Sequence, residues 1–193
     1  VGVIANQNQS ATFAAVDSTN TITGTGADLY FYVNQNTVVV NPAIIGSASL
    51  VSNGGGTLSL RPQFASNTYS GGTFVQSGTL NLQATSPFIA IPGALTITNA
   101  AVTMSTTANQ IATSSAVTIN GAGTLTLANY GTATSQTLDS ITFNNEGGNG
   151  NPGLVYGTPT ALSTVILSSA NPLTATHNSL ATTPTISTSA ATF

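Results

Sequence analysis

The fold is decided by residues 56–82, which read GTLSLRPQFASNTYSGGTFVQSGTLNL. Two short runs, 57–60 and 79–82, carry an apolar residue at every second position and begin 22 residues apart. Such alternation is typical of a strand with one buried face. Between the two runs, Gly71, Gly72 and Gly78 supply residues that adopt positive φ, as tight corners require. The stretch therefore predicts a repeating unit of short strands joined by tight turns.

The same period extends well beyond this stretch. One apolar series has spacings of 22, 22 and 23 residues: Leu58, Leu80, Val102 and Leu125. A second series has spacings of 21, 22, 24 and 24 residues: Phe74, Leu95, Val117, Ile141 and Val165. A third, looser series follows: Phe64, Phe88, Ile111, Leu138 and Leu162. Three interleaved series with one period predict a coil of about 22 residues with three short strands.

One such coil cannot bury its inward side chains alone, whereas stacked coils share a continuous core. We therefore predict an all-β protein, a right-handed parallel β-helix. A β-sandwich is the alternative, because short strands with frequent turns also fit that fold. In a sandwich, the strands on either side of residues 121–123 would form a hairpin.

The period also suggests a division of the chain. Residues 1–50 fit it less well and are expected to form an N-terminal β cap or junction. Residues 51–172 are the β-helix repeat region. Residues 173–193, rich in Thr and Ser, are expected to form an edge, a cap or a strand donated to a neighbour.

The composition is almost free of charge, and this excludes several functions. Only 3% of the 193 residues are charged, with Arg61 the single cation, although 40% are hydrophobic. Nucleic-acid binding and adhesion to anionic membranes both need several cations. With no Cys and one His, a zinc site is excluded, and we expect no metal and no cofactor. No apolar stretch reaches the length of a transmembrane helix.

Residues 56–82 resemble the autotransporter-associated β-strand repeat, also called the passenger-associated transport repeat. Its pattern G-T-L-x-L … N-T-Y-S-G-G-T-x-V-x-x-G-T-L-x-L is followed closely from Asn67 to Leu82, and weakly over residues 93–127. Residues 61–66 depart from the usual short lead-in. The resemblance implies a right-handed β-helix in the secreted passenger of an autotransporter or a related bacterial surface protein. It brings no catalytic residues to this chain. A chain that starts at Val1 is then expected to have lost a signal peptide or to be a fragment.

The sequence offers few candidates for chemistry. A glycosidase needs two carboxylates on one sugar, and the nearest pair is Asp139 and Glu146. A calcium site there, helped by Asn144 and Asn145, is a second interpretation. His177 has no nucleophile motif beside it, and Arg61 is expected to be structural. We therefore expect no catalytic residue and no enzyme.

Several residues are candidates for binding a glycan or a neighbouring subunit. Tyr30, Phe31 and Tyr32 are consecutive, so at least one of them points outward from a strand and could stack on a sugar or a neighbouring subunit. Buried packing or a role at the junction is the alternative that we favour for these aromatic residues. Tyr69 is a second candidate for glycan contact, although it or Phe74 could instead fill the interior. Asn67 and Asn99 are candidates for stacked turn positions whose amides bond the next coil.

These observations predict an extracellular or cell-surface structural and adhesive segment, a stiff β rod. Self-association into filaments is expected as well, because little charge opposes it and open end coils have unpaired edges. Residues 1–10 or the Thr-rich tail could supply the joining strand, and the neighbouring coils could equally belong to a longer chain. The alternative is a glycan-binding module, and a polysaccharide-degrading enzyme is the third interpretation.

Overall fold

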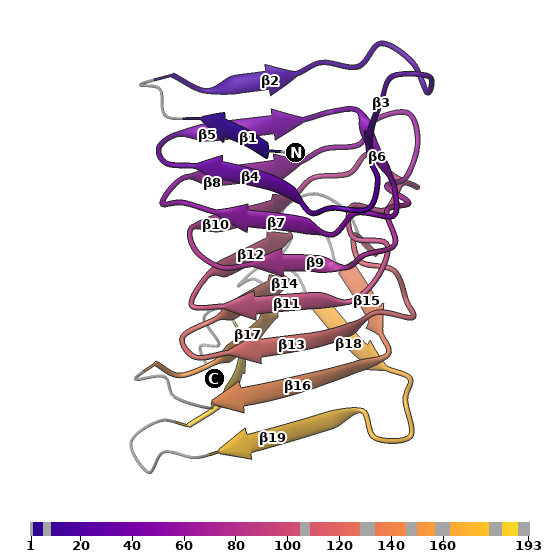
Figure 1. Cartoon of the computed structure of the whole chain (residues 1–193). Coiled ribbons are helices and arrows are strands. Elements are labelled where there is room, and N and C mark those ends of the chain that lie inside the picture. The colour runs from indigo at the N-terminus through magenta and orange to yellow at the C-terminus, as the bar shows by residue number, and fades with distance from the viewer. Residues whose placement is uncertain are drawn as a thin grey trace.

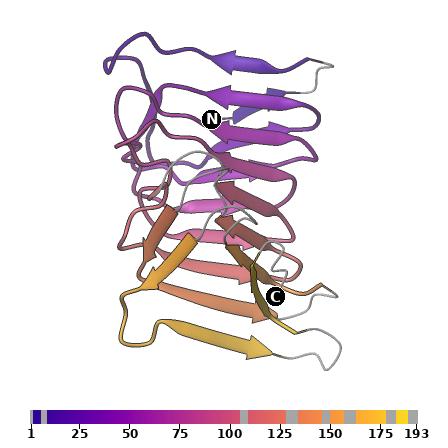
Figure 2. The same ribbon diagram turned by 180° about the vertical axis from the view of Figure 1, so that it is seen from behind.

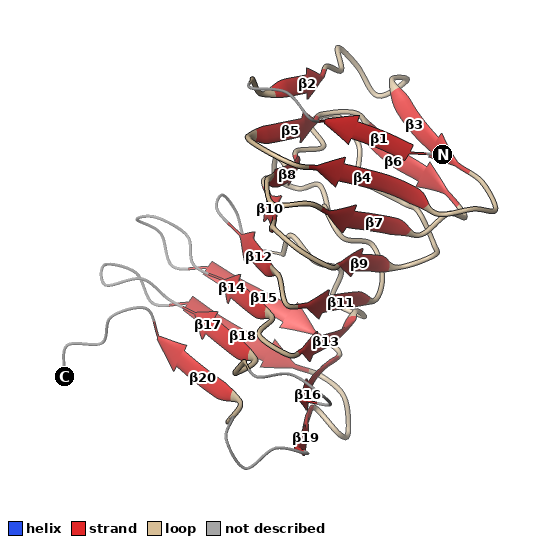
Figure 3. Cartoon of the chain, turned by 60° about the vertical axis from the view of Figure 1, so that its left-hand side comes forward, coloured by secondary structure: helices blue, strands red, loops and turns tan. Residues whose placement is uncertain are grey.

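The computed structural model describes residues 2–5, 9–104, 109–127, 134–145, 150–156, 163–177 and 183–188, and in these it contains strands and loops (Figure 3). The strands stack into a parallel β-solenoid whose coils are about 22 residues long through its middle (Figure 1). Every strand pairing is parallel. Figure 2 shows the same stack from behind.

Within the described residues, two sheets of eight strands run the length of the solenoid. Sheet A consists of β1 (Gly2–Ala5), β4 (Leu29–Val33), β7 (Leu50–Asn53), β9 (Thr73–Val75), β11 (Leu95–Thr98), β13 (Ala116–Asn120), β16 (Ser140–Asn145) and β19 (Leu173–His177). Sheet B consists of β2 (Ala11–Phe13), β5 (Thr37–Val40), β8 (Thr57–Leu60), β10 (Thr79–Leu82), β12 (Ala101–Met104), β14 (Thr124–Leu127), β17 (Gly153–Tyr156) and β20 (Thr185–Thr188).

The third side of the solenoid is a sheet only near its ends. β3 (Thr21–Gly24) pairs with β6 (Ala43–Gly46), and β15 (Thr134–Leu138) pairs with β18 (Ser163–Leu167). Between these pairs the described chain follows irregular segments, joined by one bridge between Ile91 and Ile111. The third strand expected in every coil is therefore replaced by loops in the middle of the molecule.

The first apolar series is confirmed by the strand register. Leu58, Leu80, Val102 and Leu125 are successive partners in sheet B, and all four side chains are fully buried. They belong to one hydrophobic cluster that spans most of the described chain. Because each coil presents its apolar residue at the same place, the core is a stack of matching layers.

The second series is right in its middle and wrong at both ends. Leu95, Val117 and Ile141 are partners in sheet A, but Leu95 pairs with Thr73 on its other side, so Phe74 points outward. The strand next to Ile141 in sheet A begins at Leu173, whereas Val165 lies on the third side in β18. A one-residue slip reverses the face of every side chain in a strand, and spacing alone could not detect it at Phe74.

The β-sandwich alternative is wrong. The strands on either side of residues 121–123, β13 and β14, lie in different sheets and each pairs in parallel with coils before and after it. The right-handed sense of the coil stays a prediction. So does the division at residues 50 and 172, although strands on both sides of each boundary pair within the same two sheets.

Candidate interaction surfaces

Buried side-chain amides hold the irregular third side together. Asn67 is 2% exposed and bridges two coils: its Oδ1 accepts the Ile44 backbone N–H at 2.8 Å, and its Nδ2 donates to the Ala90 carbonyl at 2.7 Å. Buried backbone groups without partners are costly, and here a side chain takes the place of a missing strand. The sequence prediction that Asn67 bonds neighbouring coils is confirmed, although the residue is buried.

Gln110 and Gln136 repeat this arrangement further along. Gln110 accepts the Ala84 N–H at 2.6 Å and donates to the Ala84 carbonyl at 3.1 Å. Gln136 contacts Ile111 in the same two-point way, at 3.1 and 2.7 Å. Each amide thus copies the paired bonds of a β-bridge, and each is fully buried or nearly so. These buried amides are structural, and their sequence signal, an isolated Gln between Thr, Ser and Asn, is too weak to identify beforehand.

The turns between sheets A and B form a polar edge along the rod. Asn53 Nδ2 donates to Gln76 Oε1 at 3.1 Å, and the Ser77 hydroxyl donates to Asn53 Oδ1 at 2.6 Å. Further along, Asn99 has a φ of 52° and its Oδ1 accepts the Ala122 N–H at 2.8 Å. The stacked turn position predicted for Asn99 is confirmed. These contacts tie each turn to the turn of the next coil.

Three aromatic side chains gather on the outer face of sheet A. Tyr30 is 47% exposed, Tyr32 is 45% and Phe74 is 38%, whereas Phe31 between the two tyrosines is fully buried. Tyr30 pairs with Val51, and Val51 pairs with Phe74, so Tyr30 and Phe74 share one column and Tyr32 lies two residues further along the strand of Tyr30. Val51 is buried although it points outward, consistent with cover from its aromatic neighbours. We name Tyr30, Tyr32 and Phe74 the aromatic patch.

Amide groups border the aromatic patch. Tyr32 pairs with Asn53, whose side chain is hydrogen-bonded to Gln76 as described above. Aromatic rings beside fixed amides are suited to sugars, because a ring face of a sugar is apolar and its hydroxyls need hydrogen-bond partners. The sequence predicted that at least one of Tyr30, Phe31 and Tyr32 would point outward, and Tyr30 and Tyr32 do. It missed Phe74, which the apolar spacing had placed inside.

Tyr69 does not belong to this surface. Its side chain is 2% exposed, and its phenol oxygen lies 2.6 Å from Thr73 Oγ1. Burial raises the pKa of this phenol well above its usual value, although the hydrogen bond with Thr73 acts in the opposite direction. The expectation that Tyr69 contacts a glycan is therefore wrong, and its alternative role as interior filling is confirmed.

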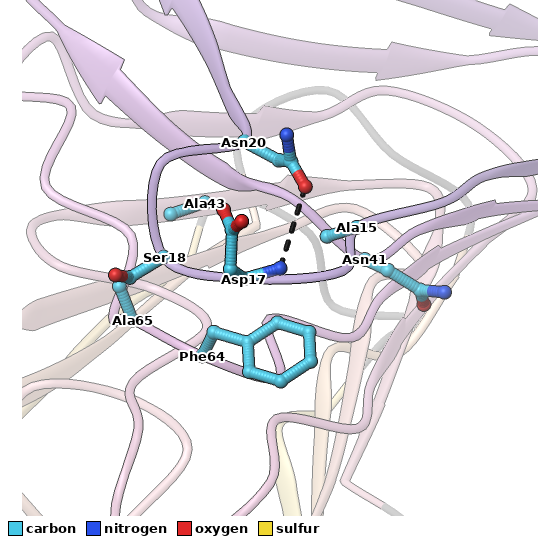
Figure 4. A pocket seen from close by; sticks show the side chains of 8 residues that line it. All are labelled: Ala15, Asp17, Ser18, Asn20, Asn41, Ala43, Phe64 and Ala65. Carbon is cyan, nitrogen blue, oxygen red and sulfur yellow. Dashed lines mark hydrogen bonds between the residues drawn. The ribbon is translucent and has the colours of Figure 1, made fainter.

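A loop near the N-terminal end contains a small hollow that includes Asp17, Asn20 and Asn41 (Figure 4). The Asp17 carboxylate accepts from the Thr19 hydroxyl at 2.6 Å and from the Thr19 backbone N–H at 2.9 Å, and these bonds lower its pKa. Asn20 Oδ1 accepts the Val16 N–H at 2.8 Å. The hollow does not admit a water-sized molecule. Asp17 and Asn20 therefore stabilise the loop itself, whereas Asn41 Oδ1 is buried without a hydrogen-bond partner.

The other candidate ionisable residues are Asp139, Glu146, Arg61 and His177. Asp139 is half-buried and its carboxylate accepts the Ser140 hydroxyl at 3.0 Å, whereas Arg61 is exposed and follows β8. Glu146 lies outside the described residues, so the Asp139–Glu146 pair and a calcium site beside it remain untested predictions. His177 pairs with Asn145 in the backbone register of β19, and neither side chain is described. In the described part of the chain, no three His, Cys, Asp or Glu residues group together.

The last described coil of the solenoid has an apolar C-terminal side. A cavity of about 340 Å³ lies there between the last strands of the three sides. Its lining consists of Ile141, Leu154, Thr164, Val165, Leu167, Leu173 and Ile186. Leu173 and Ile186 are each about half exposed, and their strands β19 and β20 are the last in their sheets. Unpaired strand edges beside exposed apolar side chains are a template for a further coil.

Comparison with known proteins identifies one segment. Residues 50–82 match the model of the passenger-associated transport repeat, and neither the curated proteins nor the solved structures compared with the chain gave a match. The matched residues span β7, β8, β9 and β10, one step of the stack in each long sheet. The chain is an autotransporter passenger-like β-solenoid segment that contains this repeat.

Two further findings bear on location. Repeats of this kind are associated with autotransporter passengers, which are typically secreted or exposed on the cell surface. Among the described residues, no helix has the length and hydropathy to cross a membrane.

Proposed function

We propose that this chain is a stiff rod segment with very few charges, part of an exported surface protein, which holds adhesive surfaces away from the cell. The observation that carries the proposal is the unbroken pairing of sheets A and B from β1 to β19 and from β2 to β20. A single hydrophobic cluster fills the space between them. Bending such a rod would require many parallel hydrogen bonds and a shared core to yield together.

Electron microscopy of the purified chain at neutral pH tests the rod. We expect short rods of uniform width whose length is proportional to the number of coils. A variant with an inserted copy of residues 79–100, one full coil, should lengthen each rod by about 4.8 Å, the strand spacing. Globular particles, or a particle length that the inserted coil leaves unchanged, would refute the proposal.

The proposal includes self-association of the chain, end to end. The apolar C-terminal cavity and the outer edges of β19 and β20, the last described strands of their sheets, support stacking of a second copy, whose β1 and β2 are the first described strands at the opposite end. The formal charge of −3 over 193 residues gives little repulsion between copies. Because the two joined surfaces differ, such contacts would propagate into filaments.

Light scattering across a concentration series tests the stacking. The exposed residues Leu173 and Ile186 are changed to Asp, and Thr126→Asp on the outer face of sheet B serves as a control for added charge. We expect concentration-dependent growth for the natural chain and the control, and a monomer for Leu173→Asp/Ile186→Asp. A natural chain that stays monomeric at high concentration would contradict this part of the proposal.

A second candidate function is recognition of neutral glycans at the aromatic patch. Exposed aromatic rings on a nearly charge-free surface, beside the bonded amides of Asn53 and Gln76, support it. A glycan array tests it, with Tyr30→Ala/Tyr32→Ala as the loss variant and the outward Thr126→Ala as the control. Binding by the natural chain and the control alone supports the function. Equal signals from all three proteins, or none from any, would exclude it.

We retain the prediction that the chain is not an enzyme. Its support is the chemistry of the described residues, in which Asp139 is bonded to Ser140 and no three His, Cys, Asp or Glu residues group together. Hydrolysis or lyase activity on a polysaccharide that is abolished by Asp139→Asn would overturn the prediction.

A further inference from the structure

The outer face of sheet A carries an unbroken column of threonine hydroxyls. Thr96 pairs with Thr118, Thr118 with Thr142, and Thr142 with Thr174, so four successive strands place the same residue at the same position. Phe74 pairs with Thr96, and therefore the column continues directly from the aromatic patch. We name Thr96, Thr118, Thr142 and Thr174 the threonine ladder.

A second polar column runs beside the threonine ladder. It lies two residues further along each strand and contains Thr98, Asn120, Asn144 and Thr176, which are also register partners. Asn120 Nδ2 donates to Thr98 Oγ1 at 3.1 Å, which links two neighbouring coils, whereas Asn120 Oδ1 and Asn144 Oδ1 are buried without a hydrogen-bond partner. The column continues toward the aromatic patch through Gln76 and Asn53, whose side chains are bonded to each other.

The geometry of the sheet fixes these groups in a regular array. Neighbouring strands are about 4.8 Å apart, and residues i and i+2 are about 6.6 Å apart along a strand. Threonine is β-branched and has few χ1 rotamers in a strand, so each hydroxyl lies in a small set of positions before any ligand arrives. Because these side chains are already ordered, the protein loses little conformational entropy when a ligand binds to them.

The chemistry of the array defines its partner. None of the eight residues in the two columns is ionisable. The six threonine hydroxyls can both donate and accept a hydrogen bond, whereas the Oδ1 atoms of Asn120 and Asn144 are buried and do not face a ligand. An acidic polysaccharide or a nucleic acid would find no cation here. We propose that the threonine ladder and its neighbouring column form a track for a linear, uncharged polysaccharide that lies along the rod axis and is anchored by stacking on the aromatic patch. This inference rests on glycan recognition at the aromatic patch, the second candidate function above.

Sheet B offers a shorter polar array. Its outer face also carries Thr57, Thr79 and Thr124, but Ala101 and Gly153 interrupt that column. The column two residues further along contains Ser59, Asn81, Thr103 and Thr126, but Ser59 is buried and Val155 follows Thr126. The inner positions of its strands, such as Leu80 and Leu125, face the core. Sheet B therefore supplies matched hydroxyls that can be removed as a control.

The experiment measures how affinity depends on ligand length. An array of neutral and acidic glycans first identifies the polysaccharide that binds the natural chain, and its oligosaccharides from disaccharide to octasaccharide are then titrated by calorimetry. The track variant is Thr96→Val/Thr118→Val/Thr142→Val, which removes three hydroxyls and keeps the β-branched shape. The control variant is Thr79→Val/Thr124→Val/Thr126→Val on sheet B. Both variants are checked for unchanged melting temperature.

We expect the natural chain and the control to bind the octasaccharide at least tenfold more tightly than the disaccharide. The track variant should bind both with the affinity of the disaccharide, and Tyr30→Ala/Tyr32→Ala should bind neither. Affinity that is independent of oligosaccharide length, or a track variant that binds like the control, would refute the proposed track. The aromatic patch would then remain as a binding site for a few sugar units. Absence of binding to every glycan overturns both the track and the second candidate function.

Discussion

The phenol oxygen of Tyr69 lies 2.6 Å from the hydroxyl of Thr73, with both side chains buried. Thr73 occupies an inward position of sheet A whose register partners are Leu50 and Leu95. A hydroxyl between two leucines needs a hydrogen-bond partner, because burial without one costs about 1–3 kcal/mol. Tyr69, from the irregular third side, supplies that partner and fills the space with its ring.

This pair predicts a loss of stability in alkali. Burial raises the pKa of Tyr69 above its usual value near 10, so the folded chain keeps the proton that the unfolded chain releases. The stabilising contribution is complete below about pH 10 and falls as the pH rises further. Urea unfolding across this pH range should show a decline in the free energy of unfolding.

Tyr69→Phe separates this effect from general alkaline damage. At neutral pH the variant should be less stable by about 1–3 kcal/mol, because the Thr73 hydroxyl loses its partner. Above pH 10, however, its stability should fall less steeply than that of the natural chain. Parallel declines of the two proteins would show that the ionisation of Tyr69 does not control alkaline stability.

Asn67 should be among the most sensitive polar positions. Asn67→Ala leaves the Ile44 N–H and the Ala90 carbonyl without their partners in a buried region, at a cost of about 2–5 kcal/mol for the two groups. Asn99→Gly is the control, because Asn99 is exposed and accepts one bond from Ala122, and glycine tolerates the positive φ of this position. Thermal unfolding should place the melting temperature of the first variant well below that of the second. Equal effects would mean that water replaces the Asn67 amide.

The stacked coils could be predicted from the sequence because they repeat with a regular period. The spacing of Leu58, Leu80 and Val102 predicts neighbouring strands, and the register confirms each pair. The third side is not periodic, since its segments differ in length and depend on single amides such as Gln110. An isolated buried Gln looks like a surface residue in a chain rich in Ser, Thr and Asn. The physical signal of its role is the unpaired backbone of a neighbouring coil, which only the fold reveals.

The interaction surfaces were harder to predict for a related reason. Sheet A changes the face of its apolar residue at β9, where Thr73 is buried and Phe74 is exposed. A pattern of apolar residues assigns Phe74 to the core, because the hydroxyl of Thr73 costs energy there unless a partner such as Tyr69 is present. The exchange of the buried and exposed positions in β9 therefore explains both the exposure of Phe74 in the aromatic patch and the buried Tyr69–Thr73 pair.

Gly78 should not tolerate a side chain. Its φ is 69°, a conformation that L residues rarely adopt, and a Cβ there would clash with the backbone carbonyls of Gly54 and Gly56 in the preceding coil. We expect Gly78→Ala to lower the free energy of unfolding by about 2 kcal/mol or more, from backbone strain and the displaced coil. Gly93→Ala is the matched control, since a Cβ there has no neighbour within 4 Å. That variant should stay within about 0.5 kcal/mol of the natural chain, and equal losses from both variants would refute this explanation.

The near absence of charge should make stability almost independent of sodium chloride. Only 3% of the residues are charged, and salt acts on electrostatic terms by shortening the screening length from about 30 Å at 0.01 M to about 3 Å at 1 M. With so few charges to screen, the urea midpoint should be the same at both salt concentrations. Sodium sulfate should still raise the midpoint, because an excluded salt strengthens apolar burial whatever the charge of the protein. A midpoint that moves strongly with sodium chloride would show that the few carboxylates, such as Asp17, govern stability, contrary to a rod held together by its layered core.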